Sequence, residues 1–186
     1  MTSLQDFERQ SLPYMGAAYN LAYWIVRDRD DAQDVVQDAF LRAFRAHDRA
    51  TSDDIKPWLL TIVRHAAYRW LSVRKRFANV IPFEGVLAGR DDNEEQLLEL
   101  PSEDPSAEEV LMSRSDQSLV RSALEDLPPV FREVIVLREL EDMSYQEIAA
   151  VTGAPIGTVM SRLARARDQL RERLRILLAK EKKNAL

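Results

Sequence analysis

Residues 144–163 read SYQEIAAVTGAPIGTVMSRL, and this stretch is the most informative part of the sequence about the fold. Ser144 followed three positions later by Glu147 is a capping box, in which the serine hydroxyl accepts a hydrogen bond from a first-turn amide and the glutamate reaches back to the cap amide. Gly153 can adopt the left-handed backbone conformation that ends a helix. The stretch therefore predicts a helix from Ser144, a turn at Gly153 and a second helix beyond Pro155.

The second predicted helix has one apolar and one polar face. Its apolar residues recur at intervals of three or four, the period of an α-helix: Val159, Leu163, Ala166, Leu170, Leu174 and Leu177. The polar face carries Thr158, Ser161, Arg162, Arg165 and Arg167. In a DNA-binding helix-turn-helix, early residues of the second helix contact base edges in the major groove and arginines hold phosphates. The capping box, the glycine and the basic helix together favour duplex DNA binding over a plain helical hairpin with a solvated basic face.

The net charge of −5 conceals a very uneven distribution of charge. Residues 64–76 contain five basic residues and no acidic one, and residues 156–183 contain nine basic residues and three acidic ones. Residues 84–109, between them, contain ten acidic residues and one basic residue. Because phosphate neutralisation requires Lys and Arg, the chain keeps two basic surfaces suited to DNA in spite of its acidic total.

The composition excludes several classes of protein. The chain has no cysteine, which excludes disulfides, thiolate metal sites and a thiol nucleophile. Its two histidines and five scattered glycines form no metal-ligand set, phosphate-binding loop or triad, so we expect no enzyme, no cofactor and no small-molecule substrate. No run of about 18 apolar residues is present, and Asp6 and Glu8 do not fit a signal peptide. We therefore expect a cytoplasmic protein without membrane insertion.

The N-terminal part has the periodicity of helices joined by short polar turns. Apolar residues spaced three or four apart predict a helix over residues 19–26. A second helix is expected to start near Asp30 or Asp31 as its cap and to end near His47. A third has Pro57 in its first turn.

Beyond residue 76 the helical rhythm is lost, and prolines and glycines are scattered through the acidic stretch, which is typical of an interdomain linker. Helical patterns resume before the helix-turn-helix, at residues 119–127 and 131–137. The sequence therefore predicts an all-α fold of two small helical domains: residues 1–76, a flexible acidic linker over residues 77–113, and a helix-turn-helix domain over residues 114–186.

Taken together, these segments resemble the bacterial extracytoplasmic-function (ECF) sigma factors, the small two-domain promoter-specificity subunits of RNA polymerase. In the C-terminal half, LPPVFREV at 127–134, SYQEIA at 144–149 and GTVMSRLARAR at 157–167 are similar to the family's fourth conserved region. In the N-terminal half, DAQDVVQDAFLRAF at 31–44 and PWLLTIVR at 57–64 are similar to its second region. Response regulators share similar helix-turn-helix sequences, but the order of all five segments around an acidic linker is specific.

The resemblance implies a polymerase-binding surface at Asp34, Gln37 and Asp38. Their spacing of three and four places them on one face of a helix, opposite its apolar face. An acidic face of this kind complements the basic clamp helices of the large subunit of the polymerase core. The alternative is an ordinary solvated helix surface.

The resemblance also implies binding of the promoter −10 element, whose non-template strand is captured as single-stranded DNA. The residues that offer cations for the backbone and planar or polar groups for bases are Lys56, Arg64, His65, Tyr68 and Arg69. Most family members have Asn where His65 stands, and commonly Asp where Arg69 stands, so the base preference at this end is expected to differ. Trp70 is interpreted as a core residue, and for Tyr68 a place in the core is the alternative to a contact with a base.

For the −35 element, the resemblance implies duplex contacts by Thr158, Ser161, Arg162 and Arg165. Met160 occupies a position often filled by Lys or Arg, so one contact of the family is expected to be missing. The acidic linker resembles the family's connecting segment, which runs through the polymerase toward the RNA exit path; the alternative is a soluble tether.

The expected function is therefore that of an ECF sigma factor, which directs promoter-specific initiation and helps to open the DNA. Its expected partners are the RNA polymerase core, promoter DNA and an anti-sigma factor, and in the holoenzyme it would be associated with the nucleoid. The free protein is expected to bind promoter DNA weakly, because the polymerase must first spread its domains. The alternative is a helix-turn-helix regulator that binds duplex DNA without acting as a polymerase subunit, which leaves the residues matched to polymerase binding unexplained.

Overall fold

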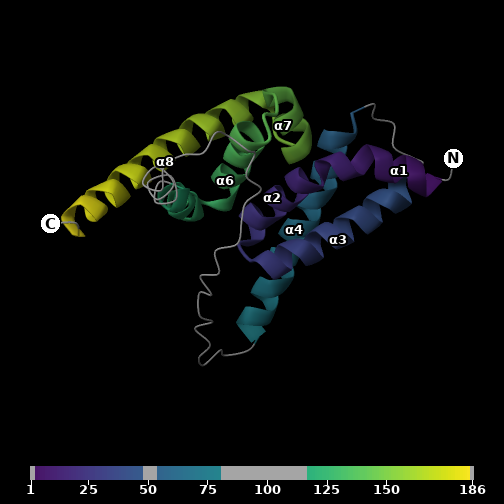
Figure 1. Ribbon diagram of the computed structural model, residues 1–186, viewed down its shortest axis with the longest axis horizontal. Helices are drawn as coiled ribbons and strands as arrows, with labels where there is room; N and C mark the ends of the chain where they lie inside the picture. The colour runs from purple at the N-terminus through teal and green to yellow at the C-terminus, as the bar shows by residue number, and fades with distance from the viewer. Residues whose placement is uncertain (1–2, 48–53, 81–116, 185–186) are drawn as a thin grey trace, which may run out of the picture.

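The computed structural model describes residues 3–47, 54–80 and 117–184, and all the regular structure in these ranges is helical (Figure 1). The predicted all-α fold is confirmed for this part of the chain, while residues 81–113 of the predicted linker lie outside it. The elements are α1 (Ser3–Ser11), η1 (Leu12–Tyr14), α2 (Met15–Val26), α3 (Arg29–Ala46), α4 (Ile55–Val80), a helix over residues 117–125, α6 (Pro129–Ile135), η3 (Val136–Leu140), α7 (Tyr145–Thr152) and α8 (Ile156–Asn184). None of the described helices is long and apolar enough to cross a membrane.

The start of α3 differs from the sequence prediction. Arg27 adopts a left-handed conformation with φ 65° and ends α2, and Asp28 follows in an extended conformation as the N-cap of α3. The Asp28 carboxylate accepts a hydrogen bond from the backbone N–H of Asp31 at 2.9 Å. The predicted cap at Asp30 or Asp31 is therefore wrong, because the turn at Arg27 places an earlier carboxylate at the helix start. Asp30 and Asp31 lie in the first turn, where carboxylates favour the positive end of the helix dipole.

The other N-terminal helices fit the sequence with two additions. Pro57 lies in the first turn of α4 as predicted, but α4 continues to Val80, four residues past the expected end of the first domain. The helix α1 was not predicted. It packs through Phe7, whose ring lies 6.3 Å from Phe40 and 5.5 Å from Phe44.

The first helix of the helix-turn-helix, α7, begins and ends as its sequence predicts. The backbone N–H of Glu147 donates to Ser144 Oγ at 3.2 Å, and the backbone N–H of Ser144 donates to Glu147 Oε2 at 2.6 Å, so both halves of the capping box are formed. Gly153 has φ 67° and its N–H donates to the carbonyl of Ala149 at 2.9 Å, which ends α7. The chain then turns into α8, the long helix that runs from α7 past α6 to the C-terminus (Figure 1).

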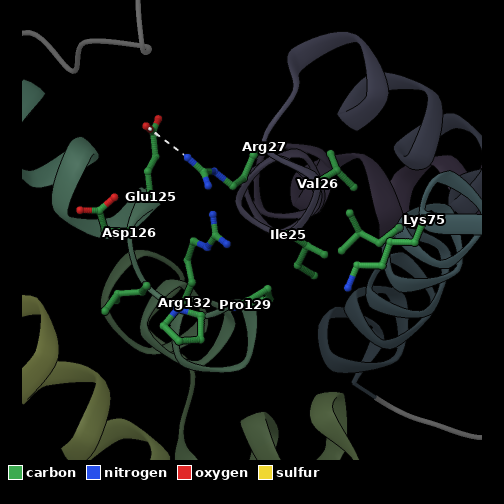
Figure 2. Close-up of a pocket in the computed structure, with 11 residues that line it drawn as sticks. Ile25, Val26, Arg27, Lys75, Glu125, Asp126, Pro129 and Arg132 are labelled. Atoms are coloured by element: carbon green, nitrogen blue, oxygen red, sulfur yellow. Dashed lines mark ion pairs between the residues drawn. The ribbon is translucent and has the colours of Figure 1, made fainter. Parts of the chain in front are cut away.

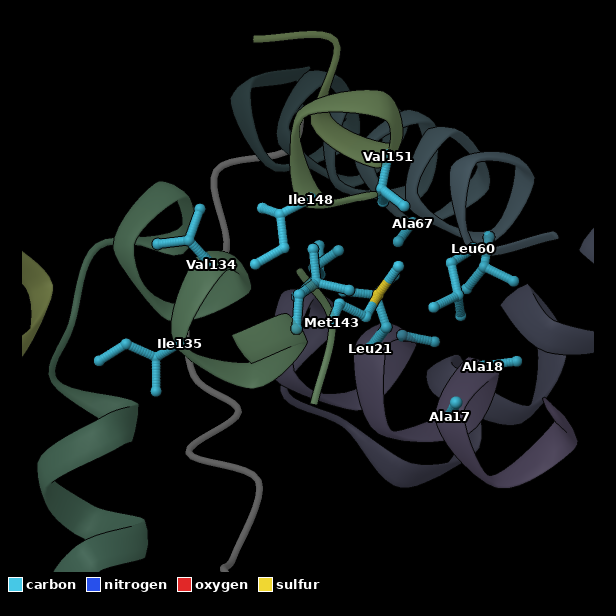
Figure 3. Close-up of a cluster of buried hydrophobic side chains, with 14 of the residues drawn as sticks. Ala17, Ala18, Leu21, Leu60, Ala67, Val134, Ile135, Met143, Ile148 and Val151 are labelled. Atoms are coloured by element: carbon cyan, nitrogen blue, oxygen red, sulfur yellow. The ribbon is translucent and has the colours of Figure 1, made fainter. Parts of the chain in front are cut away.

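The two halves of the chain share one hydrophobic core. Leu21 from α2 and Leu60 from α4 lie in the same buried cluster as Met143, Ile148 and Val151 from the C-terminal half (Figure 3). All five side chains are at most 1% exposed. In this structure α7 therefore packs directly against α4, and α6 packs against α2.

Candidate nucleic-acid and polymerase interface

The outer face of α8 carries the four residues predicted to contact the −35 element. The inner face is buried through Val159, Leu163 and Ala166, while Ser161 and Arg165 on the outside are exposed and Thr158 and Arg162 are half-buried at its edges. Ser161 Oγ donates a hydrogen bond to the carbonyl of Thr158 at 3.0 Å. Neither Arg162 nor Arg165 has an ion-pair partner within the described ranges. The structure therefore leaves both cations available, and it brings the four predicted residues together on one accessible surface.

The residues before α7 hold α8 in place. Arg167 donates two hydrogen bonds to Glu139 Oε1, at 3.0 and 2.7 Å, and these bonds tie α8 to η3. Arg138 donates to the carbonyl of Met143 at 2.8 Å, and its guanidinium lies 5.5 Å from the ring centre of Tyr145. These contacts tie both α8 and the start of α7 to η3, which supports the outer face of α8.

The acidic face of α3 is also accessible. Asp34 and Gln37 are exposed, and Asp38 is half-buried and forms an ion pair with Arg42 at 2.8 Å one turn later. The opposite face of the helix is buried through Val35, Val36 and Ala39, among others. The three residues predicted to bind the polymerase therefore lie together outside the core.

The five residues predicted to bind the −10 element are divided between two environments. His65 and Arg69 are exposed on α4. Lys56, Arg64 and Tyr68 instead face the C-terminal half of the chain: Lys56 Nζ donates to the carbonyl of Glu141 at 2.6 Å, and Arg64 Nε and Nη2 donate to the two carboxylate oxygens of Glu133 at 3.0 and 3.3 Å. The structure therefore does not bring all five residues to one open surface.

The Arg64–Glu133 pair is nearly excluded from water. The side chain of Glu133 is 0% exposed and that of Arg64 is 17% exposed. The Arg64 guanidinium also lies 4.8 Å from the ring centre of Tyr68. Burial, and secondly the charge of Glu133, raise the pKa of the Tyr68 hydroxyl far above its ordinary value. Glu133, a carboxylate of the C-terminal half, is thus the partner of Arg64, a cation that the sequence predicts to bind nucleic acid.

Glu141 makes a second bridge between the halves, because Asn20 in α2 donates to its Oε1 at 3.0 Å. Sequence reasoning missed the roles of Glu133 and Glu141. Glu133 lies within a buried run and its partner Arg64 is 69 positions away, so no local period indicates the pair. For Glu133, the signal in the sequence is an acidic residue directly before an apolar run, Val134 to Leu137.

Comparison with known proteins assigns both halves. Residues 12–77 match the family "Sigma-70 region 2" and residues 117–170 match "Sigma-70, region 4". The ECF RNA polymerase sigma-E factor of Escherichia coli strain K12 is 33% identical over 149 residues, which are 80% of this chain and 76% of that protein. The chain belongs to the ECF sigma factors.

A second relative and two solved structures agree with this assignment. The ECF sigma factor SigE of Mycolicibacterium smegmatis is 32% identical over 174 residues, and the match spans 94% of this ECF sigma factor but 62% of the mycobacterial protein. The sigma factor RpoE in complex with the anti-sigma factor NepR from Bartonella quintana has a TM-score of 0.68 at 27% identity, covering 92% of this chain and 98% of that one. CnrH in complex with the cytosolic domain of CnrY has a TM-score of 0.63 at 25% identity, covering 93% and 90%.

The two family matches contain all the predicted site residues of this ECF sigma factor. The region 2 match includes the acidic face of α3 and the exposed and occupied residues of α4, and the region 4 match includes the outer face of α8. Trp70, interpreted from the sequence as core, packs on the shared hydrophobic cluster. The buried Arg64–Glu133 pair joins one matched region to the other.

Proposed function

We propose that this chain is a promoter-specificity subunit of bacterial RNA polymerase with a regulatory and not a catalytic role. In this proposal α3 binds the polymerase core, α4 captures the −10 element as single-stranded DNA and α8 binds the −35 element as duplex. The observation that carries the proposal is the presence, on one chain, of an accessible acidic helix face and an accessible basic helix-turn-helix, each within its matched region. A stand-alone DNA-binding protein needs only the second.

The polymerase contact is assigned to Asp34, Gln37 and Asp38. Their position outside the core, opposite the buried residues Val35, Val36 and Ala39, supports a role in binding a partner, because the fold does not depend on them. Carboxylates at this position complement a basic surface such as the clamp helices of the large subunit, and they accelerate association through long-range attraction.

The DNA contacts are assigned to two surfaces that are not equally accessible. On α8, Arg162 and Arg165 are available to a duplex, with Thr158 and Ser161 beside them. On α4, His65 and Arg69 are exposed, whereas Lys56, Arg64 and Tyr68 contact the C-terminal half. Capture of the −10 strand therefore requires the halves to separate, which fits domains at residues 1–76 and 114–186 joined by the acidic segment 77–113.

The arrangement in which the two halves of the chain contact each other also fits the expected partners. Polymerase binding would hold the two halves apart, and an anti-sigma factor would keep them from the polymerase. Both structural relatives were solved in complexes with other chains: RpoE with the anti-sigma factor NepR, and CnrH with the cytosolic domain of CnrY. We place the protein in the cytoplasm, at the nucleoid when it is part of the holoenzyme.

The proposal is tested by transcription in vitro with a bacterial core polymerase and a library of promoter fragments. The expected result is a set of specific transcripts that appear only when this protein is added. Asp34→Lys should reduce transcript yield and core binding by at least about tenfold, because it places a like charge against a basic surface. Glu8→Lys, an equal charge change at an exposed position of α1, should leave both unchanged.

Two outcomes would contradict the proposal. Tight duplex binding without any polymerase-dependent transcription would support the alternative of a stand-alone regulator. Equal effects of Asp34→Lys and Glu8→Lys would show that the acidic face of α3 has no specific partner.

A further inference from the structure

The first two turns of α8 carry an exposed apolar strip beside the polar DNA-binding face. Ile156 is 43% exposed and Met160 is 52% exposed, and their spacing of four places them on one side of the helix. Arg167 lies about 20° from Met160 around the helix axis, from the rotation of about 100° per residue, and its guanidinium is held by Glu139. The part of this strip formed by Ile156 and Met160 therefore offers apolar surface and no cation.

Met160 is not needed to fill the core. The core-facing residues of the same turns, Val159 and Leu163, are 0% and 1% exposed, whereas more than half of Met160 is accessible. A half-exposed thioether adds little to the stability of the fold, because most of its surface stays in water. The Met160 side chain is therefore available to what α8 binds.

The chemistry of a methionine limits what it can recognise on DNA. Its side chain has no hydrogen-bond donor and no charge, so it neither pairs with a phosphate nor donates to a base edge. The edges of base pairs in the major groove present one apolar group, the C5-methyl group of thymine. Ile156, one turn earlier, is apolar as well and extends the same surface.

We propose that Met160 contacts the C5-methyl group of one thymine in the −35 element and so makes thymine the preferred base at that position. This inference rests on the proposed function, since it assumes that α8 enters the major groove of the −35 element. It specifies the chemical feature that the position reads, which is a methyl group and not a hydrogen-bonding pattern. It also specifies that this position contributes no phosphate contact.

The test uses the full chain with core polymerase and a promoter recovered by selection from a randomised −35 element. Each thymine of that element is replaced in turn by deoxyuridine, which removes only the methyl group. At one position the holoenzyme should bind about fourfold more weakly, the effect of leaving about one methyl group in water. In Met160→Ala the same replacement should have almost no effect, because the apolar partner is gone.

Two further variants separate this contact from other effects. Ile176→Ala removes an exposed apolar side chain about four and a half turns farther along α8 and should keep the fourfold response to deoxyuridine. Met160→Lys should lose the response and should steepen the dependence of binding on salt by about one released counterion, because it adds a phosphate contact. Alanine and lysine are both good helix formers, so neither variant should disturb α8.

Three results would overturn the inference: a selected −35 element without thymine, no deoxyuridine position that weakens binding, or the same weakening in Met160→Ala as in the original chain. Failure of the proposed function itself looks different. In that case no transcript from the library would depend on the protein, and the selection would recover no promoter.

Discussion

The carboxylate of Glu133 controls what Arg64 is available to bind. Both oxygens of this carboxylate accept hydrogen bonds from the guanidinium, and the carboxylate itself is fully buried. A buried carboxylate that loses its cation is costly, by about 3–5 kcal/mol when one partner of such a pair is removed. A DNA phosphate must therefore compete with an anion that is already in place and already dehydrated, so Arg64 is not free for the −10 strand while the halves are in contact.

Glu133→Gln should release this competition. The amide keeps the size of the side chain but loses the charge that holds Arg64, so the contact between the halves weakens. The free protein should then bind a single-stranded −10 oligonucleotide about tenfold more tightly, equivalent to about 1.4 kcal/mol, as measured by fluorescence anisotropy. Glu139→Gln removes the exposed partner of Arg167 and serves as the matched control, with no expected gain. Equal affinities for Glu133→Gln and the original chain would contradict this role of Glu133.

Tyr68 predicts a response to alkaline pH. Its pKa is raised by burial first and by Glu133 second, so its neutral form is favoured in the folded protein. The stabilisation is complete below a pH of about 10, the pKa of an exposed tyrosine, and is lost progressively as the pH rises above it. Between pH 9 and pH 11 the melting temperature of Tyr68→Phe should therefore fall less than that of the original chain. Thermal unfolding with a resolution of about 1 °C measures this difference. Tyr14→Phe is the control, and an unchanged alkaline decline in Tyr68→Phe would argue against the buried hydroxyl.

The helix-turn-helix is the element that depends most on local backbone chemistry. Gly153 ends α7 with φ 67°, a conformation that side chains with a Cβ atom rarely adopt, while Gly16 is the second residue of α2; a Cβ atom at either position would meet nothing within 4 Å. Gly153→Ala should therefore destabilise the protein by about 1 kcal/mol through backbone strain alone. Gly16→Ala should stabilise it by about 0.5–1 kcal/mol, because alanine loses less entropy in a helix. Urea unfolding checks both signs, and a destabilised Gly16→Ala would show that the two positions do not differ as described.

Helix ends were predictable from the sequence where one residue determines them. Ser144 and Gly153 carry chemistry that acts within four positions, and the structure has the cap and the turn at those residues. The predicted cap of α3 was wrong by two or three residues. The sequence contains several carboxylates there, and only the left-handed turn at Arg27 selects Asp28 as the cap. The helix α1 was missed because its burial depends on rings from α3, more than 30 positions away.

At the scale of the whole molecule, the sequence predicted two sets of helices but not their contact. The apolar faces of α4 and α7 are each visible as a period in the sequence, yet nothing in either period indicates that Leu60 and Ile148 belong to one core. The same is true of the bridges from Glu133 and Glu141, which join residues 69 to 121 positions apart. The predicted −35 and polymerase surfaces remained accessible, whereas part of the predicted −10 surface is covered by this contact.

In our proposal, the chain becomes a promoter-binding protein only as a subunit of the polymerase. The most direct measurement compares the equilibrium affinity of the free protein and of its complex with core polymerase for the same promoter duplex, at the same salt concentration. We expect the complex to bind the promoter about a thousandfold more tightly than the free protein does, and more specifically. A free protein that binds the promoter as tightly as the complex would contradict it.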